Sequence, residues 1–536
     1  MAYQADMIIV NAKAYTLDER QPYAEAVAIK GNRIIFVGAE REALGLKNPQ
    51  TRLIDAQKQS LMPGIIDSHF HLLWGSLRLK DIDLVGTRDL SELKRRILAY
   101  REKNPALDWL RGQGLGYMVA PPGQRLNRHH LDEIVRDKPL VLTCFDFHTA
   151  WCNTLAMEMA GLMQGTGPLV NGQVVMQDGL ATGELREPDA MNLVYDLIPK
   201  ATRQQSLEML KQGMAQAAAY GITSVHNMDG SFEQYSLYQQ LESEGALSLR
   251  MYMPYSINPD TPLSAVFEEA VALRESYSSG KLRSGAVKFF MDGVVESFTA
   301  FMLEPYTNRP QDLGEAIYSD EHFKSMALEA DKHGLQIFVH AIGDAAIRRT
   351  LDGYAYIREK NGPRDSRHRI EHIEVIHPED IPRLKALEVI ASMQPFHCTR
   401  PELGYLTSWM DYIGKARYPG GFPWQSLRQK GTHLCFGSDW PVVTMNPFKG
   451  FSHALNRQKW GEDLPDERQS LHDTLAAYSC DGAYAEFQEQ AKGQLKVGML
   501  ADMALLSTDI LSLPRAKMSD LKVDLTICDG EVVHEV

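Results

Sequence analysis

At 536 residues the chain is too long for one ordinary compact domain, and its length fits a large barrel with a smaller satellite domain. The composition, 44% hydrophobic and 23% charged, is typical of a globular protein and excludes a disordered or collagen-like chain. The net charge of −13 disfavours nucleic acids and anionic membranes as partners, because both are negatively charged.

The amino terminus shows no signal-peptide pattern, because Asp6 and Lys13 interrupt its apolar residues. No apolar stretch elsewhere reaches the length of a membrane span. The six cysteines are scattered without a CxxC pair, which argues against a disulfide scaffold or a zinc ribbon. We therefore expect a cytoplasmic protein whose partner is a small-molecule substrate, with no nucleic acid, no membrane and, as one option, a homodimer.

The two ends of the chain have the same character. Residues 1–60 consist of short apolar and β-branched runs separated by turn formers, and residues 490–536 repeat this pattern with Asp529-Gly530 as a hairpin turn. The intervening residues 61–489 differ, because short apolar strands alternate there with longer helical patterns. We predict one small β-sandwich domain built from both ends and an α/β domain between them.

Eight apolar runs in the middle of the chain end in polar residues, as expected for strands of a (β/α)8 TIM-like barrel with its chemistry at their carboxyl ends. They cover residues 64–71, 139–148, 221–228, 285–293, 335–344, 368–375, 388–395 and 433–441. Residues 72–138 and 149–220 are longer than a return helix requires. We interpret these two segments as insertions.

His69 and His71 form the sharpest local motif. Side chains at i and i+2 of a strand lie on the same face, so two imidazoles at a strand end can bind one metal ion. Structural histidines are the alternative for such a pair taken alone.

The run MPGIIDSHFHL around these histidines resembles the first-strand signature of the amidohydrolase superfamily. Further pieces resemble its amidohydrolase-3 branch, which includes N-substituted formamide deformylases; in chain order they are FDFHTAWCN, GELREPDA, GITSVHNMDG, VKFFMDGVVES, FVHAIGDAA, RIEHIE, MQPFHC and FGSDWPV. The resemblance covers nearly the whole chain. One departure is Phe298, at a position where relatives usually carry an arginine that could bind a polar or anionic group.

The resemblance implies roles for three further residues at strand ends. His340 and His372 become metal ligands from strands five and six, and Asp439 becomes the catalytic acid and base that moves a proton from water to the leaving nitrogen. The alternatives are structural histidines and, for Asp439, an ordinary turn.

Lys288 is the least intuitive candidate ligand, because a protonated ammonium cannot donate a lone pair to a metal. Nearby cations lower the pKa of a lysine, and a neutral amine can react with carbon dioxide to give a carbamate. By resemblance we expect a carboxylated Lys288 that bridges two metal ions. The alternative is a barrel lysine paired with a carboxylate such as Asp292.

Four residues are candidates for contact with the substrate. His148, Glu187 and His226 match recurrent positions of the branch, and Trp74 follows the first strand, where it could line a pocket. Backbone-bonded histidines, a surface glutamate and core packing are the alternatives.

The predicted reaction is hydrolysis of a non-peptide amide or formamide-type carbon–nitrogen bond by metal-activated water. Zinc, as one or two ions, suits the predicted ligands, and iron or manganese could occupy the same residues. Ester or lactone hydrolysis and metal-assisted isomerisation remain alternatives on the same scaffold. A non-enzymatic binding protein is disfavoured, because all the ligand positions and Asp439 are filled.

Overall fold

The computed structural model describes residues 4–121, 123–145, 147–169, 172–278, 280–398 and 405–536. The chain forms two compact units. The first unit comprises Met1–Ser76, Leu207–Arg400 and Leu406–Val536, and the second comprises Leu77–Ser206 and Pro401–Tyr405. None of the described helices is both long enough and apolar enough to span a bilayer.

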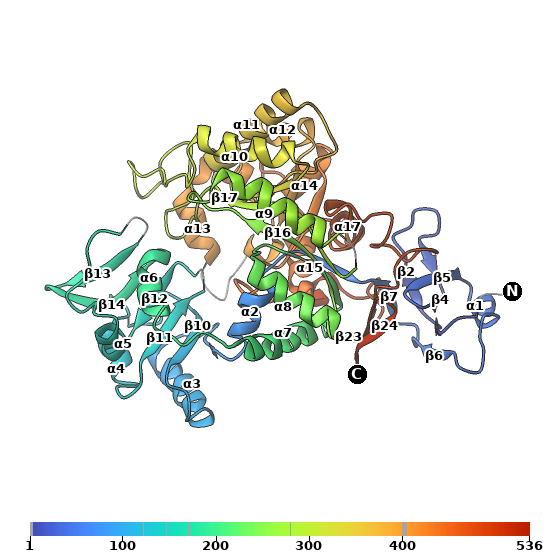
Figure 1. Ribbon diagram of the computed structural model, residues 1–536, viewed down its shortest axis with the longest axis horizontal. Coiled ribbons are helices and arrows are strands. Elements are labelled where there is room, and N and C mark those ends of the chain that lie inside the picture. Colours follow the sequence, from blue (N-terminus) through green and yellow to red (C-terminus); the bar gives the residue numbers. More distant parts are fainter. Residues whose placement is uncertain (1–3, 122, 146, 170–171, 279, 399–404) are drawn as a thin grey trace. The chain divides into compact units, whose positions relative to one another are not determined.

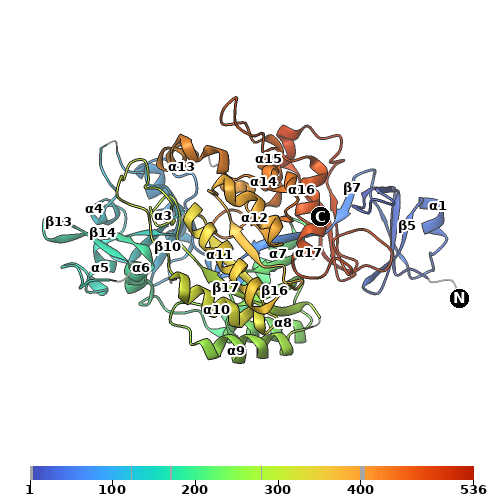
Figure 2. The ribbon, with the colours of Figure 1, turned by 90° about the horizontal axis from the view of Figure 1, so that it is seen from above.

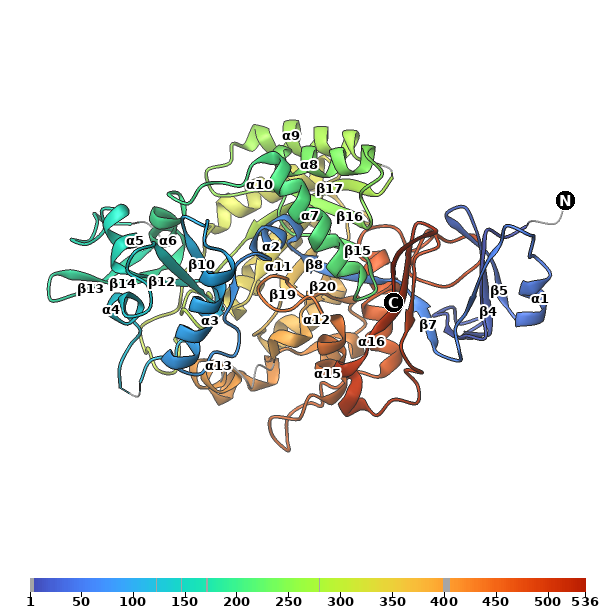
Figure 3. The same ribbon diagram turned by 90° about the horizontal axis from the view of Figure 1, so that it is seen from below.

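An eight-stranded parallel sheet forms the centre of the first unit (Figures 1 and 3). Its strands, in order, are β8 (Ile65–Phe70), β15 (Ile222–Asn227), β16 (Arg250–Ser256), β17 (Leu282–Phe290), β18 (Gln336–Ala341), β19 (Arg369–His372), β20 (Ile390–Met393) and β21 (Leu434–Phe436). The first and last strands approach each other where His71 N donates to Trp440 O at 2.9 Å and Asp439 N donates to His69 O at 2.8 Å. The sheet is therefore a nearly closed barrel, and the predicted fold class is confirmed.

Helices connect the barrel strands, as parallel neighbours require. They are α7 (Arg203–Ala218), α8 (Phe232–Ser243), α9 (Leu263–Ser276), α10 (Asp320–Lys332), α11 (Asp344–Asn361), α12 (Ile381–Ala386) and α14 (Trp424–Gln429). Because helices cover the outer face, β8, β15, β18, β19 and β20 are buried along their whole length.

Two further sheets contain strands from the chain ends. One has the order β5 (Arg33–Gly38), β4 (Ala26–Lys30), β1 (Met7–Val10) and β6 (Arg52–Asp55). The other has the order β24 (Glu531–Glu535), β23 (Val523–Cys528), β22 (Met503–Leu506), β7 (Ser60–Pro63), β2 (Lys13–Tyr15) and β3 (Tyr23–Ala24). Their apolar faces share one core, in which Ile9 and Val27 of the first sheet join Leu505 and Ile527 of the second. Residues near the two termini thus build one β-sandwich.

The second unit has its own mixed sheet and its own core. The sheet has the order β13 (Gln173–Gln177), β14 (Leu180–Arg186), β12 (Thr149–Cys152), β11 (Leu140–Cys144), β10 (Leu110–Leu115) and β9 (Ile82–Asp83). Helices α4 (Arg128–Asp132), α5 (Thr154–Met159) and α6 (Glu187–Tyr195) lie beside these strands, as Figure 2 shows.

The second unit corrects one predicted barrel strand. Residues 139–148 were expected in the barrel, but β11 pairs with β10 and β12 in the second unit. The missing barrel strand is β16, which was not predicted. Its sequence RMYMPYS contains Pro254, which lies at a register shift between β16 and β17, and a proline inside a run argues against a central strand.

Candidate metal centre

Polar side chains follow the carboxyl ends of several barrel strands. His69 and His71 lie at the end of β8, Lys288 lies near the end of β17, and His340 and His372 lie near the ends of β18 and β19. Asp439 follows β21. Since parallel barrel strands all end at the same mouth, these residues face one another there.

Three of these residues offer ligand atoms at metal-binding separation. One atom each from His69, His372 and Asp439 lies within 4.8 Å of the other two, and all three residues are buried. His71 joins them, since its Nε2 lies 3.3 Å from Asp439 Oδ1. The ring centroid of His340 lies 4.5 Å from the ring centroid of His372. Five of the predicted site residues thus form one cluster.

Burial keeps most of these imidazoles neutral, the form that can bind a metal. It lowers the pKa of His69 to about 4 and that of His340 to about 3, and it holds the pKa of His372 well below its usual value. His71 differs: burial lowers its pKa, but the carboxylates of Asp229 and Asp439 outweigh burial and raise it to about 9. A metal would therefore displace a proton from His71.

Asp439 is ionised at neutral pH. Burial raises the pKa of this carboxyl. His69 and His71 lower it by more than burial raises it, so the pKa lies below its usual range. A negative charge beside the neutral imidazole of His69 and the readily protonated imidazole of His71 favours a bound cation. Asp439 can therefore bind a metal and also accept a proton.

Lys288 is fully buried in the barrel, and its Nζ has no hydrogen-bond partner among the described residues. Burial lowers the pKa of its amine to about 8. Asp292, the alternative partner, instead accepts bonds from the backbone of Phe301, Ile342 and Gly343. His372 Nδ1 is likewise unpaired in the described part of the chain. Buried donors and acceptors without partners beside a carboxylate fit a site that holds a metal ion.

The backbone is strained at two residues of this cluster. His372 has φ +76° and Asp439 has φ +62°, in the left-handed region that residues other than glycine rarely adopt. Such strain persists only where the surrounding structure imposes it, and it is commonest at functional sites. Here the strained turns direct both side chains into the barrel mouth.

Two carboxylates bind the outer nitrogens of the first-strand histidines, and the sequence analysis assigned them no role. His69 Nδ1 lies 2.7 Å from Glu371 Oε2, and His71 Nδ1 lies 2.7 Å from Asp229 Oδ1. Arg369, itself fully buried, donates to both oxygens of Glu371 at 2.9 and 3.1 Å. Both acids lie within motifs quoted above, RIEHIE and GITSVHNMDG, and their place in these motifs is the sequence signal that could have found them.

His226 lies within the barrel and not at a surface open to a ligand. It is fully buried, its Nδ1 accepts from Arg369 Nη1 at 2.7 Å, and its Nε2 lies 3.3 Å from Glu486 Oε1. Arg369 thus connects His226 to Glu371 and, through Glu371, to His69. This geometry links His226 to the residues behind the metal ligands, and its contact with substrate stays a prediction.

The other three candidates for substrate contact divide between the units. Trp74 lies in α2 (Leu72–Arg78) with its ring 5.3 Å from that of His71. His148 and Glu187 belong to the second unit, where His148 Nδ1 lies 2.7 Å from Glu187 Oε2. The ring centroid of Phe298 lies 4.6 Å from that of Tyr412, and the Arg309 guanidinium carbon lies 3.5 Å from the Phe298 ring centroid.

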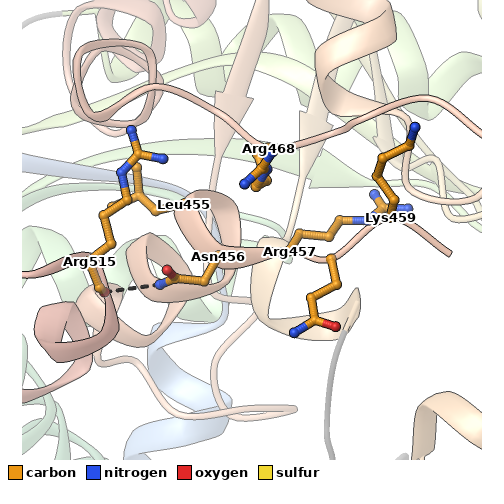
Figure 4. Close-up of a pocket in the computed structure, with 7 residues that line it drawn as sticks. Leu455, Asn456, Arg457, Lys459, Arg468 and Arg515 are labelled. Atoms are coloured by element: carbon orange, nitrogen blue, oxygen red, sulfur yellow. Dashed lines mark hydrogen bonds between the residues drawn. The ribbon is translucent and has the colours of Figure 1, made fainter. Parts of the chain in front are cut away.

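A basic hollow of about 440 Å³ lies elsewhere in the first unit, beside the end of α15 (Pro447–Asn456), and Figure 4 shows its lining. Three of the four cationic side chains that line it have partners among the described residues. Arg457 donates to the carbonyls of Gly421 and Phe422, Arg468 pairs with Asp466, and Lys459 donates to a backbone carbonyl at 2.7 Å. The barrel mouth, where the predicted metal ligands converge, remains the candidate site.

Comparison with known proteins places the chain among hydrolases. A model of the Amidohydrolase family matches residues 52–534. The chain is 30% identical over 520 residues to Protein LONG AFTER FAR-RED 3 of Arabidopsis thaliana, covering 94% of this chain and 88% of that protein. It is 24% identical over 553 residues to N-substituted formamide deformylase of Arthrobacter pascens, covering 100% and 99%. A metal-dependent hydrolase from Pyrococcus horikoshii OT3 has the same fold, with a TM-score of 0.74 at 23% identity over 95% of this chain and 99% of that one.

The barrel and the polar cluster at its mouth define the class of the molecule, a metal-dependent hydrolase. The chain belongs to the Amidohydrolase family, as its resemblance to the superfamily implied. It is accordingly a metal-dependent enzyme that hydrolyses carbon–nitrogen bonds.

Proposed function

We propose that the chain hydrolyses a non-peptide amide, of the formamide type, with Asp439 as the residue that moves the proton. The observation that carries this proposal is the buried triad of His69, His372 and Asp439, whose ligand atoms lie within 4.8 Å of one another. The name of the Arthrobacter pascens relative, N-substituted formamide deformylase, supports the choice of substrate class.

His69, His71, His340 and His372 would hold one or two divalent ions, with zinc as the proposed metal. Lys288 would join them as a carbamate, because its buried Nζ has a lowered pKa and no hydrogen-bond partner in the described residues. When bound, the metal would lower the pKa of water and polarise the scissile carbonyl.

Asp439 performs the proton transfer in this proposal. Its ionised carboxylate accepts a proton as the oxygen of water bonds to the carbonyl carbon. When the carbon–nitrogen bond breaks, the same proton passes to the leaving nitrogen, so that an acid and an amine are released. Trp74, beside His71, would form one wall of the substrate site.

We assign His226 a supporting role, on its complete burial and its bond from Arg369. The bonded pair His148 and Glu187 remains a proposed substrate contact on resemblance alone. We further propose a cytoplasmic location, and a homodimer remains a prediction of the sequence.

The experiment is a measurement of metal content and hydrolysis on the purified protein and on its H69A/H71A variant. We expect one or two transition-metal ions per chain and release of amine from N-monosubstituted formamides by the parent protein. The double variant should lose metal and turnover, because it lacks two ligands. The control is His129→Ala, which removes an exposed imidazole in α4. Full metal content and turnover in the double variant would refute the proposal.

A further inference from the structure

A phenylalanine that the reaction described above does not use lies beside the candidate metal centre. Phe290 ends β17, and 41% of it is exposed, although its neighbours Lys288 and His340 are buried. Single apolar side chains are common on protein surfaces, so this exposure by itself indicates no function. The place of Phe290 at the barrel mouth gives the exposure a meaning.

The pleat of β17 directs Phe290 toward the interior of the barrel mouth. Successive side chains of a strand point to opposite faces of the sheet. Phe289 is fully buried and packs against Tyr318 and Phe323, whose ring centroids lie 5.6 and 5.5 Å away. Since Phe323 belongs to α10, Phe289 points to the outer, helical face. Lys288 and Phe290 therefore share the inner face of the strand.

Two residues of the metal centre hold the ring of Phe290 in place. Phe290 pairs with His340 of the neighbouring strand β18, and their ring centroids lie 5.0 Å apart with the planes at 32°. Lys288 Nζ lies 4.7 Å from the centroid of the Phe290 ring. The ring thus contacts two candidate metal ligands and keeps exposed area that a bound substrate can cover.

Phe290 and Asp439 lie on opposite sides of the barrel. Asp439 follows β21, which β20, β19 and β18 separate from β17 on one side, and β8, β15 and β16 separate from it on the other. In the proposed reaction Asp439 gives a proton to the leaving nitrogen, so this nitrogen faces β21. The acyl substituent is attached to the carbonyl carbon on a different side from the nitrogen. It therefore extends away from Asp439, toward β17 and Phe290.

We infer that Phe290 determines specificity by limiting the size of the acyl group that the enzyme accepts. The acyl substituent of a formamide is a single hydrogen, which fits beside the ring. A larger acyl group meets the ring, which cannot move aside without losing its contacts with His340 and Lys288. This inference rests on the proposed function and gives a physical reason for its formamide-type substrate.

The test compares amides of one amine that differ only in the acyl group: N-butylformamide, N-butylacetamide and N-butylbenzamide. Release of butylamine gives kcat/KM of each amide for the metal-loaded parent protein and for Phe290→Ala, and metal content is measured in both proteins. The amides differ in intrinsic reactivity, but this difference cancels when the ratio of two amides is compared between the proteins. In F290A we expect the benzamide-to-formamide ratio of kcat/KM to rise at least about tenfold, because loss of the ring opens space on the acyl side.

Two further variants serve as controls. Phe290→Leu keeps part of the bulk of the side chain and should give a ratio between those of the parent protein and F290A. Leu511→Ala removes another exposed apolar side chain, 48% accessible, from the segment between β22 and η5 (Arg515–Asp520). L511A should leave the ratio unchanged.

Binding of the acid products gives a second measurement that does not depend on turnover. Formate and benzoate are the acids released from two of these amides, and titration calorimetry measures their affinity for the zinc-loaded parent protein and for F290A. We expect the ratio of benzoate to formate affinity to be higher in F290A than in the parent protein, because benzoate carries the larger group toward the position of Phe290.

The outcomes separate this inference from the proposed function. An equal change of kcat/KM for all three amides in F290A, or a loss of its metal, would show a structural role and overturn the inference. A parent protein that hydrolyses N-butylbenzamide as fast as N-butylformamide would overturn it as well, since the ring then sets no limit. If the parent protein hydrolyses none of the amides, the proposed function fails and calorimetry decides the inference. A raised ratio of benzoate to formate affinity in F290A supports it, and an unchanged ratio, or no binding of either acid, overturns it.

Discussion

The carboxylates that bind the imidazoles of His69 and His71 differ in how deeply they are buried. Glu371, which bonds to His69, is fully buried. Burial raises the pKa of its carboxyl, but Arg369 and His69 lower it by more. Asp229, which bonds to His71, is partly exposed, with 29% of its side chain accessible to solvent. In both cases Nδ1–H donates to the carboxylate, which leaves Nε2 for a metal and strengthens it as a ligand.

Replacing Glu371 with glutamine removes the charge behind His69. We expect Glu371→Gln to bind zinc roughly 10- to 100-fold more weakly, as is usual when the carboxylate behind a ligating histidine is lost. Chelator competition measures the affinity. The matched control is Asp331→Asn. It alters another buried pair of a carboxylate and a histidine, in which Asp331 Oδ1 lies 3.1 Å from His368 Nε2. Neither residue belongs to the candidate metal centre. Unchanged zinc affinity in E371Q would argue against this arrangement.

Lys288 permits a chemical test of the proposed carbamate. Lys288→Ala should lose metal and activity, because the bridging oxygens are missing. Short carboxylic acids should partly restore both by supplying oxygens at the same place, and metal content and turnover with and without added acid measure the rescue. Metal content in K288A equal to that of the parent protein would instead support a lysine that is only a neighbour of the metal.

At the scale of secondary-structure elements, α2 packs closely against the turn that carries Asp439. A Cβ atom added at Gly75 would lie 2.3 Å from the ring of Trp440, which also packs 5.0 Å from Phe70. Gly75→Ala must therefore displace Trp440 or the helix, and we expect it to destabilise the protein by about 1–3 kcal/mol. The midpoint of thermal unfolding measures this loss. The control is Gly116→Ala, since a Cβ at Gly116 has no neighbouring atom within 4 Å; equal effects of the two substitutions would contradict the argument.

The contact between α10 and the start of β19 predicts a dependence on pH. Burial raises the pKa of Asp331, but His368 and Asn361 bond to its carboxylate and, together with Arg364, lower the pKa to about 2. A lowered pKa means that the carboxylate stabilises the fold above its unfolded value near 4 and loses this contribution as the pH falls toward 2.

Asp331→Asn should therefore destabilise the protein by about 2 kcal/mol at pH 7 and by less at pH 3. Thermal unfolding of both proteins at the two pH values measures the difference. A gap that stays constant, or that widens in acid, would show that the charge of Asp331 is not responsible.

At the scale of the whole molecule, local pattern predicted the kind of fold more reliably than the partners of each strand. The run of β11 has the apolar character of a barrel strand, but it pairs with β10 and β12 in the second unit, and the run itself does not show which strands it pairs with. The barrel strand β16 was missed because Pro254 interrupts it. Strand membership in a sheet is a non-local property, which a run of residues does not contain.

At the candidate site, too, the sequence predicted the residues but not all of their partners. The motifs predicted His69, His372 and Asp439 as one cluster, and their ligand atoms lie together. They did not predict that Glu371 binds His69 across 302 positions, or that His226 accepts a hydrogen bond from Arg369. Such pairings depend on side-chain packing in the closed barrel.

The central claim is that the histidines and Asp439 at the barrel mouth hold the catalytic metal. Its most direct test is an anomalous difference map from crystals of the zinc-loaded protein, recorded on both sides of the zinc absorption edge. The account predicts one or two peaks at about 2.0–2.3 Å from the nitrogens of His69 and His71 and their neighbours. A fully zinc-loaded, active protein whose only anomalous peaks lie away from these residues would contradict it.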